Sequence, residues 1–193
     1  MAGISAANVA VGKPDLAVSG GVLVAPIGTT RPTSLAGPID PAYVSVGYVS
    51  TDGVTETSER STEEIRASGG QKVRTVQTEF GTTLSLTLIE SRNAEALKFV
   101  FGEDNVDTST AGEIVVKRNE KTLPYVQLLV SMLDGENSSH LDVGRAQVTE
   151  VGDVVYTDGE AISYELTISC DPDDNGDTLI ERKAADGDAE GEG

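Results

Sequence analysis

The sequence predicts a mainly β protein with one short α-helix. The residues from Val73 to Glu90 alternate between apolar and polar side chains, a pattern typical of a strand with one buried face. A second alternating segment runs from Ala161 to Cys170. Turn-forming residues separate these and several shorter apolar runs, whereas the stretch from Ala94 to Phe101 carries the end signals of a helix.

Composition excludes several classes of protein. The chain has 193 residues, of which 38% are apolar, enough to fill the core of one domain. Its single cysteine, Cys170, excludes an intramolecular disulfide. No stretch approaches the roughly 20 apolar residues of a membrane-spanning helix, and the first residues lack the pattern of a secretion signal. We therefore expect no membrane partner and no secretion.

The charge of the chain is strongly negative. Its formal net charge is −18, from 32 acidic and 14 basic residues. Tight binding to nucleic acid needs Lys and Arg side chains that release counterions from phosphates, so this chain is poorly suited to it. The acidic excess serves either solubility alone or a surface that passes close to DNA without holding it.

The N-terminal part alternates between irregular segments and short strands. Residues 1–20 are small and polar and contain Gly12 and Pro14, which favour an irregular arm. We expect a strand over 22–25 that ends at Pro26, a proline-rich extended loop, and a strand over 44–50.

Residues 51–72 form the longest polar interruption and end in Gly69 and Gly70. Ser61 and Glu64 have the spacing of a capping box, compatible with one or two helical turns through Ile65. Long loops are commonly functional or disordered, so this segment is either a solvated loop or an ordered contact between subunits. Six charged residues are candidates for that contact: Glu56, Glu59, Arg60, Glu63, Glu64 and Arg66.

The predicted strand over 73–90 is too long for its domain. It would span roughly 60 Å, whereas a compact chain of this size has a radius of gyration of about 16 Å. Either the strand bends at Gly81, or part of it leaves the body and pairs with a neighbouring subunit. Its apolar face, which we expect to be buried, carries Val76, Phe80, Leu84, Leu86 and Leu88.

The predicted helix has a signal at each end. Asn93 is suited to cap the first turn, and Gly102 is placed to end the helix after Phe101. Leu97 and Phe101 face one way with Val100 beside them, and we expect this stripe to cover the apolar face of the sheet.

The C-terminal half predicts further strands. The residues from Leu123 to Leu133 are apolar on both parities, as expected for a strand buried on both faces. We expect the other strands at 114–117, 141–151, 154–157, 161–170 and 178–180. The residues after Lys183 are small and acidic, which favours disorder.

The sequence contains few residues that are suited to catalysis. His140 is the only histidine and lies in a polar turn sequence, which favours a solvated loop residue. Cys170 falls on the apolar parity of its strand and is expected to be a small core residue. The sequence has no phosphate-binding loop, zinc spacing or nucleophile elbow. We therefore expect neither an enzyme nor a cofactor.

One short motif resembles half of a calcium loop. Asp171, Asp173, Asn175 and Gly176 fit its first positions, but the twelfth position, which should supply a bidentate carboxylate, is Arg182. Asn-Gly after a strand is also a strong turn signal. The motif therefore favours a turn over a metal site.

Four blocks, in this order, resemble one known family. They are VLVAPIGTTRPT, AYVSVGYVSTDGVTET, GGQKVRTVQTEFGTTLSLTLIES followed by the predicted helix, and QVTEVGDVVYTDGEAISYELTISCDPD. From about Val22 to Arg182 the chain is similar to the major tail protein, or tail tube protein, of long noncontractile-tailed bacteriophages, closest to versions from phages of actinobacteria.

The resemblance implies a tail-tube-type β-sandwich or barrel with one short flanking helix. The domain would cover residues 21–182, between the arm (1–20) and the acidic tail (183–193). Such subunits form hexameric rings that stack around the tape measure protein, in a virion tail assembled in the host cytoplasm. Tail terminator and distal tail proteins would be further partners, and phage DNA would pass through the lumen without specific binding.

The polar faces of the two alternating strands are the candidates for the lumen. Neither 75–89 nor 159–170 contains Lys or Arg. The predicted lumen residues are Gln77, Glu79, Thr83, Ser85, Thr87, Ser163, Glu165, Thr167 and Ser169. Two other functions stay open: a binding or decoration module of a virion, and the tube protein of a contractile injection system.

Overall fold

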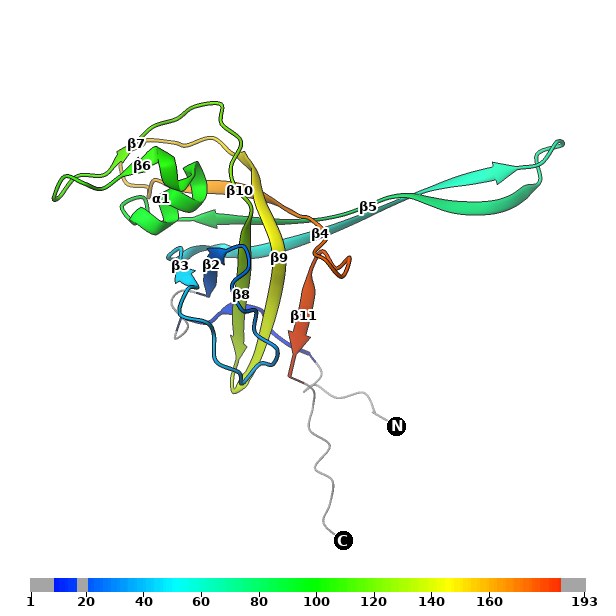
Figure 1. Ribbon diagram of the computed structural model, residues 1–193, viewed down its shortest axis with the longest axis horizontal. Coiled ribbons are helices and arrows are strands. Elements are labelled where there is room, and N and C mark those ends of the chain that lie inside the picture. The colour runs from blue at the N-terminus through cyan, green and yellow to red at the C-terminus, as the bar shows by residue number, and fades with distance from the viewer. Residues whose placement is uncertain (1–8, 17–20, 185–193) are drawn as a thin grey trace, which may run out of the picture.

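The computed structural model describes residues 9–16 and 21–184. In this part of the chain, nine strands form one antiparallel sheet, two more form a small sheet, and one α-helix covers the large sheet (Figure 1). The predicted mainly β class with one helix is confirmed, and the sheets are not closed into a barrel. The elements are β1 (Lys13–Pro14), β2 (Val22–Pro26), β3 (Val44–Ser45), β4 (Val49–Arg66), β5 (Lys72–Leu88), α1 (Ala94–Phe101), the 3-10 turn η2 (Glu103–Asn105), β6 (Val106–Asp107), β7 (Val115–Val116), β8 (Val126–Asp134), β9 (Asn137–Val151), β10 (Tyr164–Cys170) and β11 (Ile180–Lys183).

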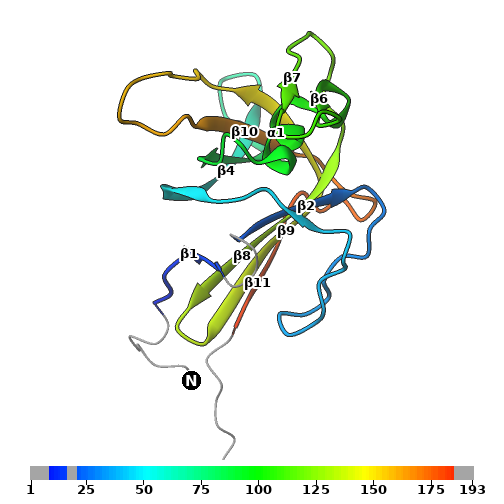
Figure 2. The same cartoon turned by 90° about the vertical axis from the view of Figure 1, so that its left-hand side faces the viewer.

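Strand β9 belongs to two regions of the large sheet. Its C-terminal half pairs with β10, which leads to β5 and β4. Its N-terminal half pairs with β11, and β8 links it to β2 and β1 (Figure 2). Both regions contribute to the main core, where Leu86, Leu166 and Val143 meet Leu97 of α1. A smaller cluster, Leu23, Ala25, Tyr43 and Leu129, packs separately.

The helix has the predicted bounds. The Asn93 side chain accepts hydrogen bonds from the backbone N–H of Glu95 at 3.0 Å and of Ala96 at 3.4 Å. Gly102 ends the helix with a positive φ of 90°, which favours glycine. Leu97 and Val100 are buried as expected, and Phe101 contacts Tyr164 edge to face. The capping residues at its two ends were therefore sufficient to predict this helix.

The expectation of a loop over 51–72 is wrong. Most of this segment is strand β4, which pairs with β5 from Val54 opposite Leu86 to Arg66 opposite Lys72. The capping-box helix is also wrong, because the long free edge of β5 offers the Thr- and Ser-rich segment a continuous ladder of hydrogen bonds. The two strands leave the body together as a hairpin (Figure 1). We call residues 59–81 of this hairpin the arm, and the rest of the described chain the body.

The arm does not arise from a bulge at Gly81, which pairs regularly with Glu59. Part of the long strand therefore leaves the body, as one of the two expected outcomes had it, but it does so paired with β4 of its own chain. The nine β5 residues before Gly81 extend about 30 Å.

Several smaller expectations need correction. Residues 154–157 are irregular, and the strand over 44–50 is interrupted at Gly47, where a Cβ would lie 2.6 Å from the Glu90 carboxyl carbon. Within the expected N-terminal arm, β1 pairs with β8, while residues 1–8 and 17–20 lie outside the described residues. Lys183 belongs to β11, and the disorder predicted for the C-terminal tail concerns residues that, from 185 on, are not described.

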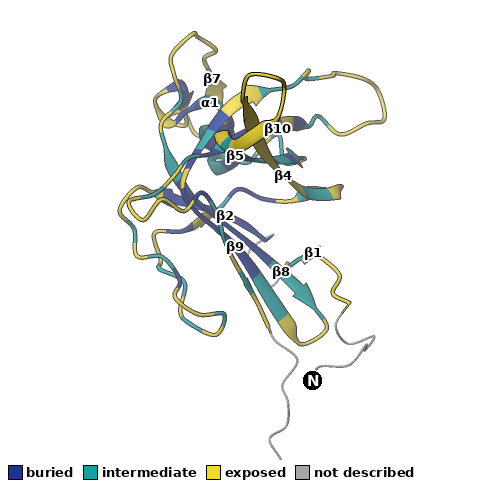
Figure 3. Ribbon diagram, turned by 90° about the vertical axis from the view of Figure 1, so that its right-hand side faces the viewer, coloured by how far each residue is buried: buried dark blue, intermediate teal, exposed yellow. Residues whose placement is uncertain are grey.

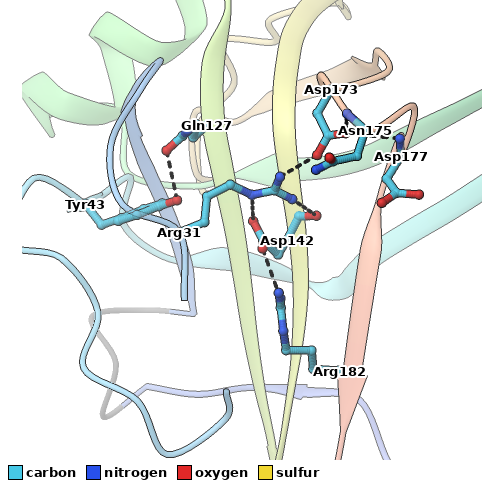
Figure 4. A network of polar contacts seen from close by, with 8 residues as sticks. All are labelled: Arg31, Tyr43, Gln127, Asp142, Asp173, Asn175, Asp177 and Arg182. Carbon is cyan, nitrogen blue, oxygen red and sulfur yellow. Dashed lines mark hydrogen bonds and ion pairs between the residues drawn. The ribbon is translucent and has the colours of Figure 1, made fainter. Parts of the chain in front are cut away.

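A buried carboxylate on β9 joins this strand to the loop after β2 and to β11, in the region of the sheet that we call the lower region (Figure 4). Asp142 on β9 is fully buried and accepts hydrogen bonds from Arg31 Nε at 2.9 Å and Arg182 Nη1 at 3.0 Å. Arg31 also donates to Asp173 at 2.6 Å. This contact lowers the pKa of Asp173, whose other carboxylate oxygen accepts the backbone N–H of Asn175. The predicted turn is thus confirmed, and the loop after β2 and strand β11 are tied to β9.

His140 is buried, so its prediction as a solvated loop residue is wrong. Strand β9 begins at Asn137, and His140 lies between Ser131 on β8 and Arg182 on β11. Pairing on both sides, which local sequence does not reveal, removes the ring from water. Burial lowers the pKa of His140 and Arg182 lowers it further, while Asp142 and Asp15 act in the opposite direction.

Replacing the buried carboxylate should destabilise the fold. Asp142→Asn leaves two arginines without their anion, and we expect a loss of about 3 kcal/mol in the free energy of unfolding, measured with urea. Glu181→Gln is the matched control, because it breaks the exposed pair with Lys183, which contributes less than about 1 kcal/mol. Equal effects of the two substitutions would contradict the clamp role of Asp142.

His140 should make stability depend on pH. The folded chain binds the proton more weakly than the unfolded chain, whose histidine has a pKa of 6.5. Stability is therefore complete above pH 6.5 and falls as the pH drops below it. Denaturation from about pH 7.5 to about pH 5 should show this loss, and His140→Gln should remove much of it. An unchanged slope in the variant would assign the effect to other groups.

Candidate functional site

The polar faces of β5 and β10 lie side by side. The register places Thr83 opposite Ser169, Ser85 opposite Thr167, and Thr87 opposite Glu165. These residues are partly exposed, whereas the residues between them are buried. Facing residues of an antiparallel pair share one side of the sheet, so the structure brings together these six of the predicted lumen residues.

The other three predicted lumen residues lie elsewhere. Gln77 and Glu79 belong to the arm, outside the body. Ser163 precedes β10 and has no partner in its ladder.

Two neighbouring strands extend this polar face, which sequence reasoning missed. Strand β4 adds Thr55 opposite Ser85 and Thr57 opposite Thr83. Strand β9 adds Glu150 opposite Thr167 and Gln147 opposite Ser169. Thr55 and Thr57 were not predicted as part of this face because their segment was expected to be a loop. We use "polar face" below for these residues together with the six described above.

One end of the polar face carries a network around Asp171. Its carboxylate accepts hydrogen bonds from Tyr125 at 2.6 Å and Ser169 at 2.7 Å, which lower its pKa. Arg145 lies 4.8 Å from the centre of the Tyr125 ring. The acid-only character of β5 and β10 therefore does not extend to β9, which supplies Arg145 near the Asp171 carboxylate.

Both faces of the arm carry apolar and polar side chains. The register shifts between Ser61 and Thr62, so a β-bulge at Thr78 reverses the alternation of β5 beyond it. One side carries Phe80 opposite Arg60, Gln77 opposite Thr62 and Thr75 opposite Glu64, and Arg60 donates to the Gln77 side chain at 2.8 Å. The other side carries Glu79 opposite Ser61, Val76 opposite Glu63 and Arg74 opposite Ile65. We call Ile65, Val73, Val76 and Phe80 the apolar side chains of the arm.

Three of these side chains are exposed. Phe80 is 46% exposed and Ile65 is 51% exposed, and Val73 near the tip is 65% exposed. The expected burial of Phe80 is therefore wrong for the single chain, where the Arg60 guanidinium lies 5.0 Å from the centre of its ring. Figure 3 shows the arm pointing toward the viewer with most of its ribbon in the exposed class. Alternation alone could not reveal this, because the same pattern serves buried strands.

The six predicted contact residues all lie on β4 and are exposed. They do not form one patch, because Arg60 and Glu64 lie on one side of the arm and Glu59 and Glu63 on the other. Glu64 also holds Arg66 at 2.5 Å and Lys72 at 2.7 Å across the hairpin.

The end of the arm is a defined turn. Ala67 N–H donates to the Gln71 carbonyl at 2.8 Å, and Gly70 N–H donates to the Ala67 carbonyl at 3.0 Å. Gly69 and Gly70 have φ values of 97° and 88°, where glycine is favoured. Arg66 donates to the Gly70 carbonyl at 3.0 Å. The turn holds the two strands in register.

Within the described ranges, residue types that bind metals or act as nucleophiles do not form a site. Across 9–16 and 21–184, no three His, Cys, Asp or Glu side chains are placed to hold a metal ion. Burial raises the pKa of Cys170 to about 12, which makes its thiol a poor nucleophile. Among the helices of the described chain, none is long and apolar enough to cross a membrane.

Similarity to solved structures is distant. The tube-terminating cap of the anti-feeding prophage is 11% identical, with a TM-score of 0.48, and the match covers 91% of this chain and 95% of the cap. A chain of the sheath–tube complex of the extracellular contractile injection system PVC, in its extended state, is 12% identical, with a TM-score of 0.42 and coverage of 94% and 100%. A search of curated protein sequences finds no match.

The family is identified by sequence. A model of the family described as "Phage tail tube protein" matches residues 15–183, which include every strand of the large sheet from β2 to β11 as well as α1. This chain therefore belongs to the phage tail tube protein family, and it is a structural, non-enzymatic component of the virion tail.

Proposed function

We propose that the protein polymerises as stacked hexameric rings into the tube of a long noncontractile phage tail. The rings enclose the tape measure protein, and tail terminator and distal tail proteins bind the ends of the tube. The observation that carries this proposal is the arm, a two-stranded extension that exposes Ile65, Val73 and Phe80 in the single chain.

The energetics of the arm favour a contact between subunits. An isolated two-stranded ribbon is marginally stable in water. Covering a large apolar side chain such as Ile65, Val73 or Phe80 contributes about 1.5 to 3 kcal/mol for each one fully buried. A neighbouring copy that covers these side chains gains this energy, and the same neighbour can pair with the open edge of β4.

The polar face is suited to the lumen. It presents hydroxyl groups and carboxylates, and the opposite side of β5 and β10 packs into the core. Carboxylates repel a DNA duplex within a Debye length of about 8 Å at physiological salt. In this proposal Thr83, Ser85, Thr87, Glu165, Thr167 and Ser169 line the lumen in the body, and Ser163 lies at the end of that row. Glu79 continues the row along the arm, whereas Gln77 lies beyond the bulge on the other side of the hairpin. Phage DNA thus passes without specific binding.

Electron microscopy of the purified protein tests the proposed function. Tubes of stacked rings are the expected result. Dispersed monomers at high concentration, also in the presence of the tail initiator complex, would contradict it and favour a decoration module.

Shortening the arm should abolish polymerisation without unfolding the body. Residues 62–78 can be replaced by Asn-Gly, because Ser61 faces Glu79 and a two-residue turn closes such a hairpin. We expect a folded monomer by circular dichroism and sedimentation, and no tubes by microscopy. Tubes of normal appearance from this variant would contradict the role of the arm.

Two matched double variants separate the apolar from the polar side chains of the arm. Val76→Ser with Phe80→Ser removes one apolar side chain from each side of β5 and should raise the concentration needed for assembly about tenfold or more. Gln77→Ser with Glu79→Ser removes one polar side chain from each side of the same strand and should have a much smaller effect. Light scattering against protein concentration measures both, and a reversed order would assign the contact to the polar side chains.

Reversing charge on the polar face should slow DNA passage. Glu150→Lys with Glu165→Lys creates phosphate contacts in every subunit, each favoured by counterion release. Virions should have tails of normal length but slow or incomplete DNA ejection, relieved by added salt. Glu136→Lys, in the exposed turn before β9, is the control. Unchanged ejection from the double variant would place these glutamates outside the lumen.

A further inference from the structure

The two ends of the long axis of the molecule carry complementary surfaces. The tip of the arm, residues 65–74, contains Arg66, Lys72 and Arg74 and no acidic residue. The opposite end, residues 103–116 around β6 and β7, contains four acidic residues and no basic one. Figure 1 shows the tip and the β6–β7 end at opposite extremes of the structure.

Each end also exposes apolar side chains. At the tip these are Ile65 and Val73, 51% and 65% exposed. At the β6–β7 end they are Ile114 and Val115, 36% and 39% exposed. Two surfaces that both expose apolar side chains and that carry opposite charges are typical of the two sides of a protein interface.

The β6–β7 end is hollowed. A groove with a volume of about 610 Å³ lies between residues 108–116, the start of α1 and β10. Its apolar lining includes Leu97, Ile114, Val116 and Tyr164. Glu113 lines the groove and Glu103, Asp104 and Asp107 are exposed nearby, while Arg92 is the one cation among the lining residues. The groove thus combines an apolar floor with an acidic surrounding.

We propose that the tip of one copy inserts into the groove at the β6–β7 end of the next copy. This assignment rests on the proposed self-assembly and names the receiving surface. A contact between two different surfaces at opposite ends of the molecule is heterologous, so every copy both offers a tip and receives one, and the contact repeats along the polymer.

Two other surfaces fit the tip less well. The groove beside 117–123, of about 670 Å³, is lined by three basic and three acidic residues, so it offers the cationic tip no excess of negative charge: Lys117, Arg118, Lys121, Glu120, Glu150 and Asp153. The polar face carries carboxylates, but its hydroxyl groups offer nothing to cover Ile65 and Val73. The β6–β7 end provides both acidic residues and exposed apolar side chains.

Cysteine pairing tests the contact directly. Ser68→Cys places a thiol at the tip and Thr110→Cys places one at the groove, both at exposed positions. The native Cys170 is buried and its pKa is raised to about 12, so it does not compete. The two single variants are mixed, assembled into tubes and oxidised, and non-reducing gels should show a covalent dimer. Ser68→Cys mixed with Thr157→Cys, which lies in another exposed loop, should give none.

The outcomes separate this inference from the proposed function. Tubes without a dimer through Thr110→Cys, or with an equal yield through Thr157→Cys, would overturn the assignment of the groove and leave the proposed tube intact. Failure of the unmodified protein to form tubes would overturn both.

A charge exchange gives an independent test. Lys72→Glu with Arg74→Glu, and Asp104→Lys with Glu113→Lys, should each raise the concentration needed for assembly about tenfold or more. All four substitutions in one chain restore opposite charges at the contact and should recover most of the loss. A quadruple variant that assembles no better than either double variant would contradict the pairing of these two surfaces.

Discussion

The antiparallel ladder between β4 and β5 determines most of what this protein can do. In the body the ladder forms part of a layered structure, with Leu84 and Leu86 buried against the core. Past Gly81 the same hydrogen bonds continue, but no second layer covers the side chains. The arm is therefore an extension of the core sheet, and a bulge between Glu79 and Gln77 distributes its apolar side chains over both faces.

The body is suited to hold such an extension because its two regions share β9. Asp142 joins three segments that are distant in sequence through Arg31 and Arg182. A carboxylate removed from water is costly unless its partners are well placed, and here both oxygens have an arginine. This network ties the loop after β2 and strand β11 to β9, so its role is to fasten this region of the sheet.

Local signals in the sequence were sufficient for some elements and not for others. The helix follows from Asn93 and Gly102, which act on adjacent backbone groups, and the polar face follows from a period of two. Strand β4 was missed because its residues are polar on both sides, and it becomes a strand only by pairing with β5. Phe80 was misplaced for a related reason, since apolar alternation cannot distinguish a side chain buried in its own chain from one that awaits a partner.

Hydrogen–deuterium exchange, compared between monomers and assembled tubes, tests the central claim that the arm is covered by a neighbouring copy. The amide groups of residues 59–81 should exchange quickly in the monomer, where the ribbon has no second layer, and become strongly protected in the tube. The amides of α1, which are already packed in the single chain, should change little. Equal exchange of the arm in both states would show that assembly leaves it uncovered and would contradict this account.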